Sequence, residues 1–420
     1  MRRIVIEILN ILAKEILVKY KPVVIGITGS VGKSSSKKAI YEILKQKYKV
    51  YGDKSDYSVE VGIPLAIIGL ESGGRSVRKW IKIIIKALIR LIKKFDYPDI
   101  LLLEMGVNGP GDMKKMLKVV KPDIAVITNI GKFPSHTKYF KDAKHVTKEK
   151  SLIVKSLGKK DLAILNCDDK SIKDLTDSIK GKIITYGFGD NSEIKAVEVL
   201  MGNKKIRTED GSMGMGFKIS YKGTTVPFRL PYALGKGQIY STLSAVAVGI
   251  HFGLNLVEMS EALSEYQPLA GRMKMIKGIN NSLIIDDTFN ASPSSTLSAL
   301  ETVEKLAAER KIAVLGDMLE LGEYCEKGHR EVGKAVFTSV DMLFTYGSRS
   351  KIIFQKAKDM GMKKENIKHF ENKKMLIEAL KHNIKNGDII LIKGSRAMHM
   401  EDVVREIMVK PELAGELLVK

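Results

Sequence analysis

The sequence predicts an α/β fold built around parallel sheets. Short apolar strands alternate with helical patterns along most of the 420 residues, and successive β–α–β units produce this order. The helical patterns are amphipathic, with lysines mostly at their polar positions. The expected strands cover residues 23–27, 100–104, 124–128, 163–166, 284–286, 312–315, 342–345 and 389–392.

The chain is expected to form two lobes, because 420 residues exceed the size of one ordinary core. The stretch from Pro268 to Gly278 looks like a hinge, and a new series of strands and helices starts after it. We therefore expect an amphipathic helix at 1–20, a first lobe at 21–270 and a second lobe at 271–420. Within the first lobe, residues 196–231 alternate in short runs with Gly turns, which indicates a small antiparallel insert.

Composition narrows the class of protein. The 70 basic and 48 acidic residues give a formal net charge of +22, but the lysines are spread along the whole chain without an arginine-rich arm. Nucleic acid is therefore not an expected partner. No apolar run approaches the ~18 residues of a membrane span, and no cleavage site of a secretion signal follows the N-terminal pattern. Cys167 and Cys325 lie far apart, which excludes a disulfide scaffold and favours a globular protein of the cytoplasm.

A phosphate-binding loop is predicted where the first strand ends. This strand leads into Gly29, Ser30, Val31, Gly32, Lys33, Ser34 and Ser35, after which a helical pattern begins. The glycines let backbone N–H groups face phosphate oxygens, Lys33 would reach the outer phosphates, and the Ser34 hydroxyl would complete a Mg²⁺ shell. The strict motif requires a glycine at Ile27, whereas Gly26 stands one position earlier. ATP is favoured over GTP because the chain has no Asn-Lys-x-Asp motif.

A metal site is expected beside this loop. Glu104 ends an apolar strand at the carboxyl edge of the sheet, where ligands bind in open α/β folds. A charge after four apolar residues is costly unless it is paired, which favours a functional interpretation of Glu104. His136 follows the next strand, and with Glu104 and Ser34 it could hold Mg²⁺ bridged to ATP. A histidine taken alone is more often a surface or packing residue, and that alternative stays open for His136.

The segment 284–293, Ile-Ile-Asp-Asp-Thr-Phe-Asn-Ala-Ser-Pro, resembles the Asp-Asp-x-Tyr-Asn-Ala-x-Pro signature of the Mur ligases. It is most similar to the branch of that family that adds D-alanyl-D-alanine. Further motifs agree in order, at residues 26–34, 104–106, 127–131, 165–169, 271–273, 314–322 and 393–396. The resemblance covers the chain from about Lys21 to its C-terminus. It implies a P-loop-containing Mur ligase central domain and a Rossmann-like C-terminal ligase domain.

The resemblance also implies an activity, that of an ATP-dependent acid–amino-acid ligase of peptidoglycan synthesis. ATP would phosphorylate the C-terminal carboxylate of a muramoyl-tripeptide, and the amine of D-alanyl-D-alanine would attack the resulting acyl phosphate to form an amide. The implied cofactors are ATP and Mg²⁺. The implied partners are a peptide carboxylate and a D-amino acid or dipeptide.

Motif matches with the family assign roles to residues of this chain. The implied metal ligands are Ser34, Glu104, His136 and a carbamylated Lys150, and the implied catalytic residues are Lys33, Lys150, His136 and Arg272. Asn166, Asp287 and Asn290 are implied to bind ATP, and Lys393, Ser395 and Arg396 to bind the incoming amine substrate. Two alternatives to these roles remain. One is that Lys150 is an ordinary helix-surface lysine. The other is that the loop at 393–396 only caps the sheet and does not touch substrate.

Some positions depart from the family's pattern. The residues ahead of Val23 are too few to form the N-terminal domain that grips the uridine nucleotide in the family. Ser58-Val59 stand where the D-alanyl-D-alanine-adding branch carries paired asparagines, and Lys138 stands where a Glu is expected. Gly237-Gln238 and Ser241 replace a His-Asn pair and an Asn. The ATP-binding motifs are intact. These motifs alone do not establish that the chain recognises a uridine-linked peptide.

Two other functions therefore stay open. One is a Mur-type ligase that acts on a lipid-linked or non-wall peptide. The other is a non-catalytic ATP-binding regulator. A regulator has no need of a complete metal site, and the sequence retains all of its expected residues: Lys33, Ser34, Glu104, His136 and Lys150. The oligomeric state is not defined by the sequence.

Residues 76–95 are expected to form a basic amphipathic helix. Lys79, Lys82, Lys86, Arg90 and Lys93 recur at three- and four-residue steps on an otherwise apolar helix. One interpretation is peripheral contact with an anionic membrane at its inner face, near a lipid-linked substrate. The other, which we favour from the sequence, is that this helix and the one at 1–20 pack on each other and replace the contacts of the family's N-terminal domain.

Overall fold

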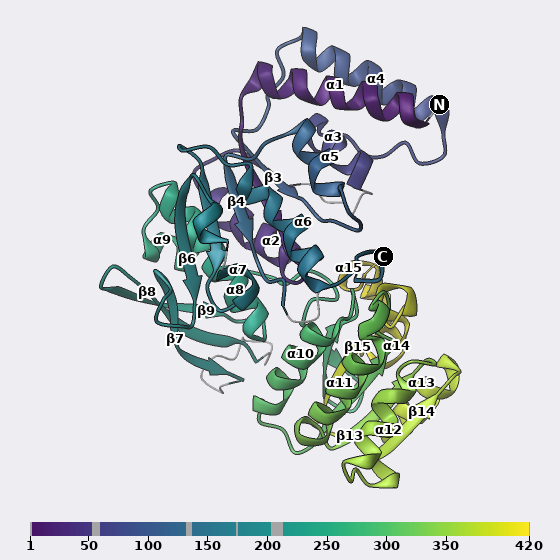
Figure 1. The fold of residues 1–420 in the computed structure, drawn as a ribbon. Helices are drawn as coiled ribbons and strands as arrows, with labels where there is room; N and C mark the ends of the chain where they lie inside the picture. Colours follow the sequence, from purple (N-terminus) through teal and green to yellow (C-terminus); the bar gives the residue numbers. More distant parts are fainter. Residues whose placement is uncertain (1, 53–58, 132–136, 174, 203–212, 420) are drawn as a thin grey trace.

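The computed structural model describes residues 2–52, 59–131, 137–173, 175–202 and 213–419, which form two α/β lobes, each built around one sheet (Figure 1). The helices of the first lobe are α1 (Arg2–Tyr20), α2 (Lys33–Leu44), α3 (Val59–Ile68), α4 (Val77–Ile92), α5 (Asp112–Val119), α6 (Ala143–Lys155), α7 (Lys170–Lys173), α8 (Lys236–His251) and α9 (Leu256–Ala262). Its strands are β1 (Val23–Thr28), β2 (Val50–Gly52), β3 (Ile100–Glu104), β4 (Ile124–Ile127), β5 (Leu162–Asn166), β6 (Lys182–Gly187), β7 (Ile194–Met201), β8 (Met215–Tyr221) and β9 (Thr224–Leu230).

The second lobe begins with β10. Its strands are β10 (Lys274–Gly278), β11 (Ser282–Asp287), β12 (Lys311–Gly316), β13 (Met342–Tyr346), β14 (Ile367–Phe370) and β15 (Ile389–Lys393). Its helices are α10 (Pro293–Lys305), α11 (Cys325–Ser339), α12 (Lys351–Asp359), α13 (Lys373–Asn383), α14 (Glu401–Ile407) and α15 (Ala414–Leu417). Every strand expected from the sequence is present, and the predicted α/β class is confirmed.

The first sheet has the strand order β2-β3-β1-β4-β5-β6-β7-β8-β9. Its strands are parallel as far as β7, and β7, β8 and β9 then pair antiparallel. The antiparallel strands expected near 196–231 are thus present, and they extend the main sheet at one edge. The second sheet has the order β10-β11-β15-β12-β13-β14 and is parallel except for the β10–β11 pair.

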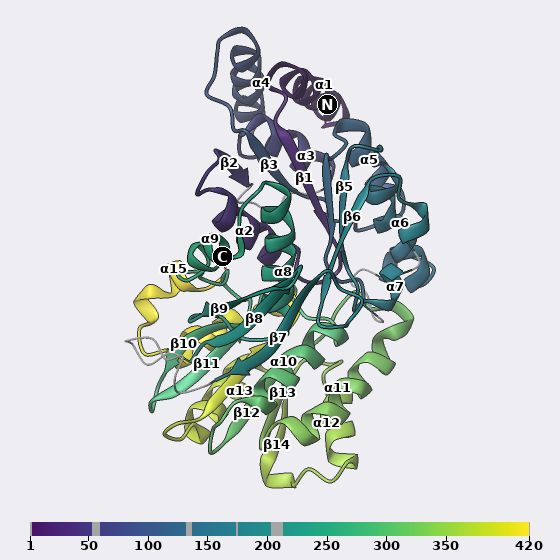
Figure 2. The ribbon, with the colours of Figure 1, turned by 90° about the vertical axis from the view of Figure 1, so that its left-hand side faces the viewer.

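Helices cover both faces of each sheet, which is why the parallel strands are continuous apolar runs. On the first sheet, α2, α8 and α9 cover one face, and α3, α5 and α6 cover the other (Figures 1 and 2). Helices α1 and α4 form an outer layer on the second of these faces. On the second sheet, α10, α11 and α12 pack on one face and α13 and α14 on the other. No helix in the described ranges has the length and apolar character to cross a membrane.

The parallel strands bring the predicted site residues to one edge of the first sheet. The β1–β3 register places Ile27 beside Glu104, and the β1–β4 register places Thr28 beside Ile127. The phosphate loop, which follows β1, therefore emerges between the carboxyl ends of β3 and β4. This is the edge at which open α/β sheets bind ligands.

Candidate active site

The backbone of the phosphate loop depends on its glycines. Gly29 has a φ of +147° and Gly32 a φ of +90°, values that side chains disfavour. A Cβ at Gly29 would lie 2.0 Å from Thr128 Oγ1, so the position accommodates glycine alone. The N–H of Ser30 donates to the carbonyl of Asn129 at 2.6 Å, which fastens the loop to the end of β4. Helix α2 begins at Lys33, within the loop motif, as in helix N-termini that bind phosphate.

Two lysines meet at one carbonyl of this loop. Lys33 Nζ donates to Gly29 O at 3.1 Å, and Lys150 Nζ, from α6, donates to the same oxygen at 2.9 Å. Lys150 is only 1% exposed, which excludes the alternative that it is a surface lysine. Burial, together with the positive charge of Lys33, holds the pKa of Lys150 well below its ordinary value.

Ser34 and Glu104 form a hydroxyl–carboxylate pair beside the loop. Ser34 Oγ donates to Glu104 Oε2 at 3.1 Å, and Lys37 Nζ lies 2.8 Å from Glu104 Oε1. Burial acts to raise the pKa of Glu104, but the nearby positive charges, Lys37 foremost, outweigh it and hold that pKa below its usual value. The carboxylate is therefore ionised at neutral pH, the form that ligates a divalent cation.

Arg272, from the second lobe, contacts the Ser34–Glu104 pair. Its Nη2 donates to Ser34 Oγ at 3.4 Å. Its guanidinium carbon lies 3.8 Å from the centre of the Phe289 ring, so the planar group rests on an aromatic face. The structure thus joins three of the predicted residues, Ser34, Glu104 and Arg272, at one point between the lobes.

Two consecutive aspartates hold the backbone on either side of Arg272. Asp286 Oδ2 accepts the N–H of Gly271 at 3.0 Å, and Asp287 Oδ1 accepts the N–H of Met273 at 3.2 Å. Both aspartates end β11, so the second sheet sets the position of the arginine. Asp286 is fully buried, and this burial raises its pKa to about 6.

Asp287, Asn290 and Lys393 form a second cluster of predicted residues. Lys393 Nζ lies 2.6 Å from Asp287 Oδ2 and donates to the Asn290 carbonyl at 2.8 Å. Lys393 is 2% exposed, so its charge is compensated within the protein. The predicted contacts of Asp287 and Asn290 with ATP, and of Lys393 with substrate, stay predictions.

The other two residues of the predicted amine-binding loop also contact the protein itself. Ser395 is buried and its Oγ accepts the N–H of Leu319 at 2.8 Å. Arg396 is partly exposed, and its Nη1 lies 2.7 Å from Glu401 Oε1. Arg396 is therefore the residue of this loop whose side chain reaches solvent.

Asn166 ends β5 and lies apart from the Ser34–Glu104 pair. Its Oδ1 accepts the N–H of Asp168 at 3.1 Å, whereas its buried Nδ2 has no hydrogen-bond partner in the described structure. Asp168 also accepts the hydroxyl of Tyr240 at 2.9 Å, and Tyr240 meets Phe188 edge to face. A buried donor without a partner is available to a ligand, and the predicted contact of Asn166 with ATP stays a prediction.

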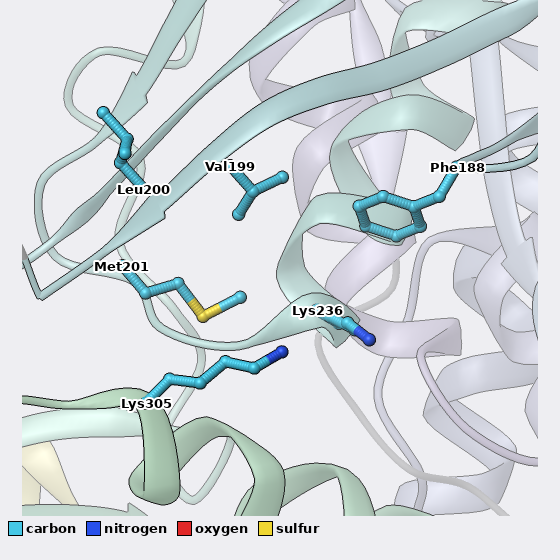
Figure 3. Close-up of a pocket in the computed structure, with 6 residues that line it drawn as sticks. All are labelled: Phe188, Val199, Leu200, Met201, Lys236 and Lys305. Carbon is cyan, nitrogen blue, oxygen red and sulfur yellow. The ribbon is translucent and has the colours of Figure 1, made fainter.

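A cavity of about 500 Å³ lies where the two lobes meet (Figure 3). Its walls are Phe188, Val199, Leu200, Met201, Lys236 and Lys305. Glu301 lies 2.7 Å from Lys236 Nζ and 2.8 Å from Lys305 Nζ, so it links the start of α8 to α10 across the lobes. The residues that line the cavity include none from the phosphate loop.

Gln238 is one of the positions that depart from the family's pattern. It lies in the first lobe and contacts Arg272 of the second lobe. Its Nε2 donates to the carbonyl of Arg272 at 3.0 Å, and its Oε1 accepts the hydroxyl of Tyr266 at 3.0 Å. Gln238 is buried. The glutamine therefore holds the backbone of Arg272 from the first lobe, in addition to the two aspartates of the second lobe.

The residues around the loop fit a bound ATP with Mg²⁺. Ser30 Oγ is buried without a hydrogen-bond partner among the residues described, as expected of a hydroxyl that contacts a phosphate oxygen. Ser34 and Glu104 supply a hydroxyl and a carboxylate, and Mg²⁺ characteristically completes its shell with water and phosphate oxygens. His136, the other predicted ligand, lies outside the described residues. Within these residues, no group of three or more His, Cys, Asp or Glu side chains could hold a metal ion.

Three residues at this site were not predicted from the sequence. Lys37 lies four residues after Lys33, on the same face of α2, and that spacing is the signal that could have identified it. Asp286 and Phe289 belong to the segment that carries the family resemblance, but their roles in holding Arg272 depend on tertiary contacts.

The fold and the site together define a class of protein with a phosphate-binding loop on one α/β lobe and an arginine from a second α/β lobe beside it. Comparison with known families identifies it further. The family described as "Mur ligase middle domain" matches residues 27–249, and "Mur ligase, glutamate ligase domain" matches residues 271–396. The chain belongs to the Mur ligase family, as its motifs predicted, and is an ATP-dependent ligase that forms amide bonds.

Similar proteins agree with this assignment. A UDP-N-acetylmuramoyl-tripeptide–D-alanyl-D-alanine ligase of Bacillus subtilis (strain 168) is 30% identical over 402 residues, covering 95% of this chain and 79% of that protein. The protein of the same name from Escherichia coli (strain K12) is 27% identical over 390 residues, covering 91% and 76%. The crystal structure of a MurF ligase from Thermotoga maritima in complex with ADP matches with a TM-score of 0.78 at 22% identity, covering 96% and 83%.

We predict that Gly29→Ala weakens ATP binding by about 100-fold, equivalent to about 2.7 kcal/mol. The new Cβ would overlap Thr128 Oγ1, so the loop would have to leave the end of β4. Titration calorimetry with ATP measures the change. Gly223→Ala is the matched control, because Gly223 also has a positive φ but a Cβ there meets nothing within 4 Å. Unchanged ATP affinity of Gly29→Ala would contradict the role of the loop.

We predict that Asp286 makes the folded protein less stable as the pH rises. Its pKa is raised from 3.8 to about 6 in the fold, so its contribution is fully present below pH 3.8 and is lost as the pH passes 6. The loss amounts to about 3 kcal/mol, because one pKa unit corresponds to about 1.4 kcal/mol. Urea unfolding of the wild type and of Asp286→Asn at pH 3 and pH 7 should show the wild type losing about this much relative to the variant. A constant difference between the two proteins would refute the assignment.

Proposed function

We propose that the chain joins the carboxylate of a UDP-linked muramoyl-tripeptide to the amine of D-alanyl-D-alanine, driven by ATP. The convergence of Ser34, Glu104 and Arg272 beside the phosphate loop carries the ATP-dependent part of this proposal. The substrates are those named for relatives that match nearly the whole chain. In this proposal residues 21–270 hold ATP and residues 271–420 close over it.

The reaction proceeds in two steps. A carboxylate oxygen of the peptide attacks the γ-phosphorus of ATP, the bond to the β–γ bridging oxygen breaks, and ADP leaves an acyl phosphate behind. The amine then attacks the acyl carbon, and the tetrahedral intermediate expels phosphate with the bonding electron pair as the nitrogen loses a proton. The products are an amide, ADP and inorganic phosphate.

The residues of the site meet the electrostatic demands of these steps. Lys33 and the N–H groups of the loop neutralise the phosphates, and Arg272 stabilises the phosphoryl group during transfer from the side of the second lobe. Ser34 and Glu104 would hold Mg²⁺, which when bound offsets the charge of the phosphates. Because Arg272 and the loop belong to different lobes, closure of the lobes brings the acceptor and ATP together.

Lys150 has the surroundings that a carbamate requires, and we include this modification in the proposal. The neutral amine adds CO₂, a nitrogen–carbon bond forms, one proton leaves, and the side chain becomes an anion. Lys150 is buried, its Nζ contacts a backbone carbonyl, and no carboxylate in the described residues hydrogen-bonds to it. An anionic oxygen at this position would face the positive charge of Lys33 and supply an oxygen ligand for a cation at the phosphate loop.

We predict Mg²⁺-dependent phosphate release when ATP, UDP-muramoyl-tripeptide and D-alanyl-D-alanine are all present, with the condensed product seen by mass spectrometry. Lys33→Ala should lower the rate by about 100- to 1,000-fold, because it removes a cation that stabilises the transferred phosphoryl group. Lys159→Ala, at an exposed lysine, is the matched control.

Other outcomes of this assay separate the alternatives. Phosphate release that requires a lipid-linked or non-wall peptide would overturn the substrate assignment and keep the ligase chemistry. No release with any peptide would favour the ATP-binding regulator instead.

We predict that Lys150 carries the carbamate in solution. With ¹³C-labelled bicarbonate, the wild type should show a carbamate carbon resonance that is absent from Lys150→Met. Lys148→Met is the matched control, because Lys148 lies on the same helix but is exposed. A resonance that persists in Lys150→Met, or one that is missing from the wild type, would refute the modification.

A further inference from the structure

Helix α4 has a second apolar face that the protein does not cover. Its inner residues pack against the body of the first lobe, and among them Ile83 and Ala87 are buried. The outer face consists of Val77, Ile81, Ile85, Leu88, Ile89 and Ile92, which are between 44% and 82% exposed. These six residues are separated by steps of one, three or four, so they form one stripe along the whole helix.

This outer face concentrates the exposed apolar surface of the molecule. The described chain has 17 exposed large hydrophobic residues, of which six form the outer face of α4. Ile4, Ile11 and Val18 on the neighbouring α1 and Phe95 just after α4 are four more. The remaining seven are scattered over both lobes. Single exposed apolar residues are ordinary, whereas a continuous stripe indicates a binding surface.

A basic edge runs beside the apolar stripe. Arg78, Lys79, Lys82 and Lys86 follow one another along α4, Lys93 comes directly after its end, and all five are exposed. No acidic residue occurs between Ser76 and Phe95, and no described carboxylate forms an ion pair with these five side chains. The edge therefore carries an uncompensated positive charge.

Helix α4 is firmly attached to the lobe, so the direction of its outer face is fixed. Lys19 Nζ, at the end of α1, donates to the carbonyls of Arg90, Leu91 and Lys93 at 3.1, 2.7 and 2.9 Å, which caps the C-terminus of α4. The helices α1 and α4 therefore pack on each other, as one of the two sequence interpretations expected. That packing uses the inner side of α4 and leaves the outer face exposed.

We infer that the outer face of α4 docks the enzyme on an anionic membrane surface. The aliphatic stripe would enter the boundary between headgroups and acyl chains, and the basic edge would contact the anionic headgroups. A second copy of this chain fits less well, because symmetric pairing through α4 would bring two basic edges together without a carboxylate between them. The partner must be negatively charged and accept aliphatic side chains, and an anionic bilayer has both properties.

The docked orientation follows from the fold. Helix α1 leads into the amino end of β1 and α4 leads into the amino end of β3, whereas the phosphate loop and Glu104 lie at the carboxyl ends of these strands. Figures 1 and 2 show α1 and α4 at one end of the molecule and the second lobe at the other. The docked enzyme would therefore keep its active site facing away from the bilayer.

Co-sedimentation of the full chain with vesicles tests this inference. The wild type should bind vesicles of phosphatidylcholine with phosphatidylglycerol, should not bind phosphatidylcholine alone, and should dissociate as salt is added. Ile85→Ser/Ile92→Ser and Lys82→Glu/Lys86→Glu should each weaken binding by at least about tenfold. Thermal unfolding of each variant would confirm that it is folded, independently of any enzymatic activity.

Matched variants control for general effects of hydrophobicity and charge. Val257→Ser/Val409→Ser removes two exposed apolar side chains elsewhere, and Lys159→Glu/Lys160→Glu reverses two exposed charges elsewhere. Both should bind vesicles as the wild type does. The inference is overturned if the wild type binds no anionic vesicles, or if the controls lose binding equally. It is also overturned if the wild type is a dimer that Ile85→Ser/Ile92→Ser dissociates, because the face would then be a self-association surface.

Discussion

The position of Arg272 relative to the phosphate loop is the constraint on which the rest of the site depends. A long, flexible side chain acquires a defined place here because its backbone is held through Gly271 and Met273, and its guanidinium rests on Phe289. The second sheet supplies these contacts from the end of β11 and the loop that follows it. Gln238 holds the carbonyl of the same residue from the first lobe. Arg272 is thus fixed by both lobes, and the way the lobes meet decides whether its guanidinium reaches Ser34 beside the phosphate loop.

The site gathers more positive than negative charge. Among the residues that the structure describes, four cations, Lys33, Lys37, Lys150 and Arg272, lie around the loop, and Glu104 is a carboxylate among them. Desolvated cations that repel one another are unfavourable, and the lowered pKa of Lys150 is one consequence. A triphosphate supplies the opposite charge at this place. Binding of ATP should therefore stabilise the folded site by linkage, because the unfolded chain does not assemble these cations.

Most of the scaffold could be predicted from the sequence, because buried parallel strands are contiguous apolar runs and a phosphate loop is a contiguous motif. Short edge strands such as β2 and β14 lack enough residues to show such a run. The environment of Lys150 was ambiguous for a different reason: lysines around it indicate a solvated helix, and only the packing of α6 against the loop buries it. The role of Asp286 depends on Gly271, fifteen residues away in sequence, and local patterns do not reveal such contacts.

The topology that assembles the active site also separates it from α4. In a parallel sheet all carboxyl ends lie at one edge, so the loops that carry the chemistry cannot share an edge with the helices that lead into the amino ends. Changes in the outer face of α4 therefore leave the contacts of Ser34, Glu104 and Arg272 intact, and the two surfaces can evolve independently. A face that has no structural role in the site, and that exposes aliphatic side chains beside unpaired lysines, is hard to explain by stability alone. A partner outside the chain accounts for both features, and a partner at this end of the molecule leaves the nucleotide free to enter from solution.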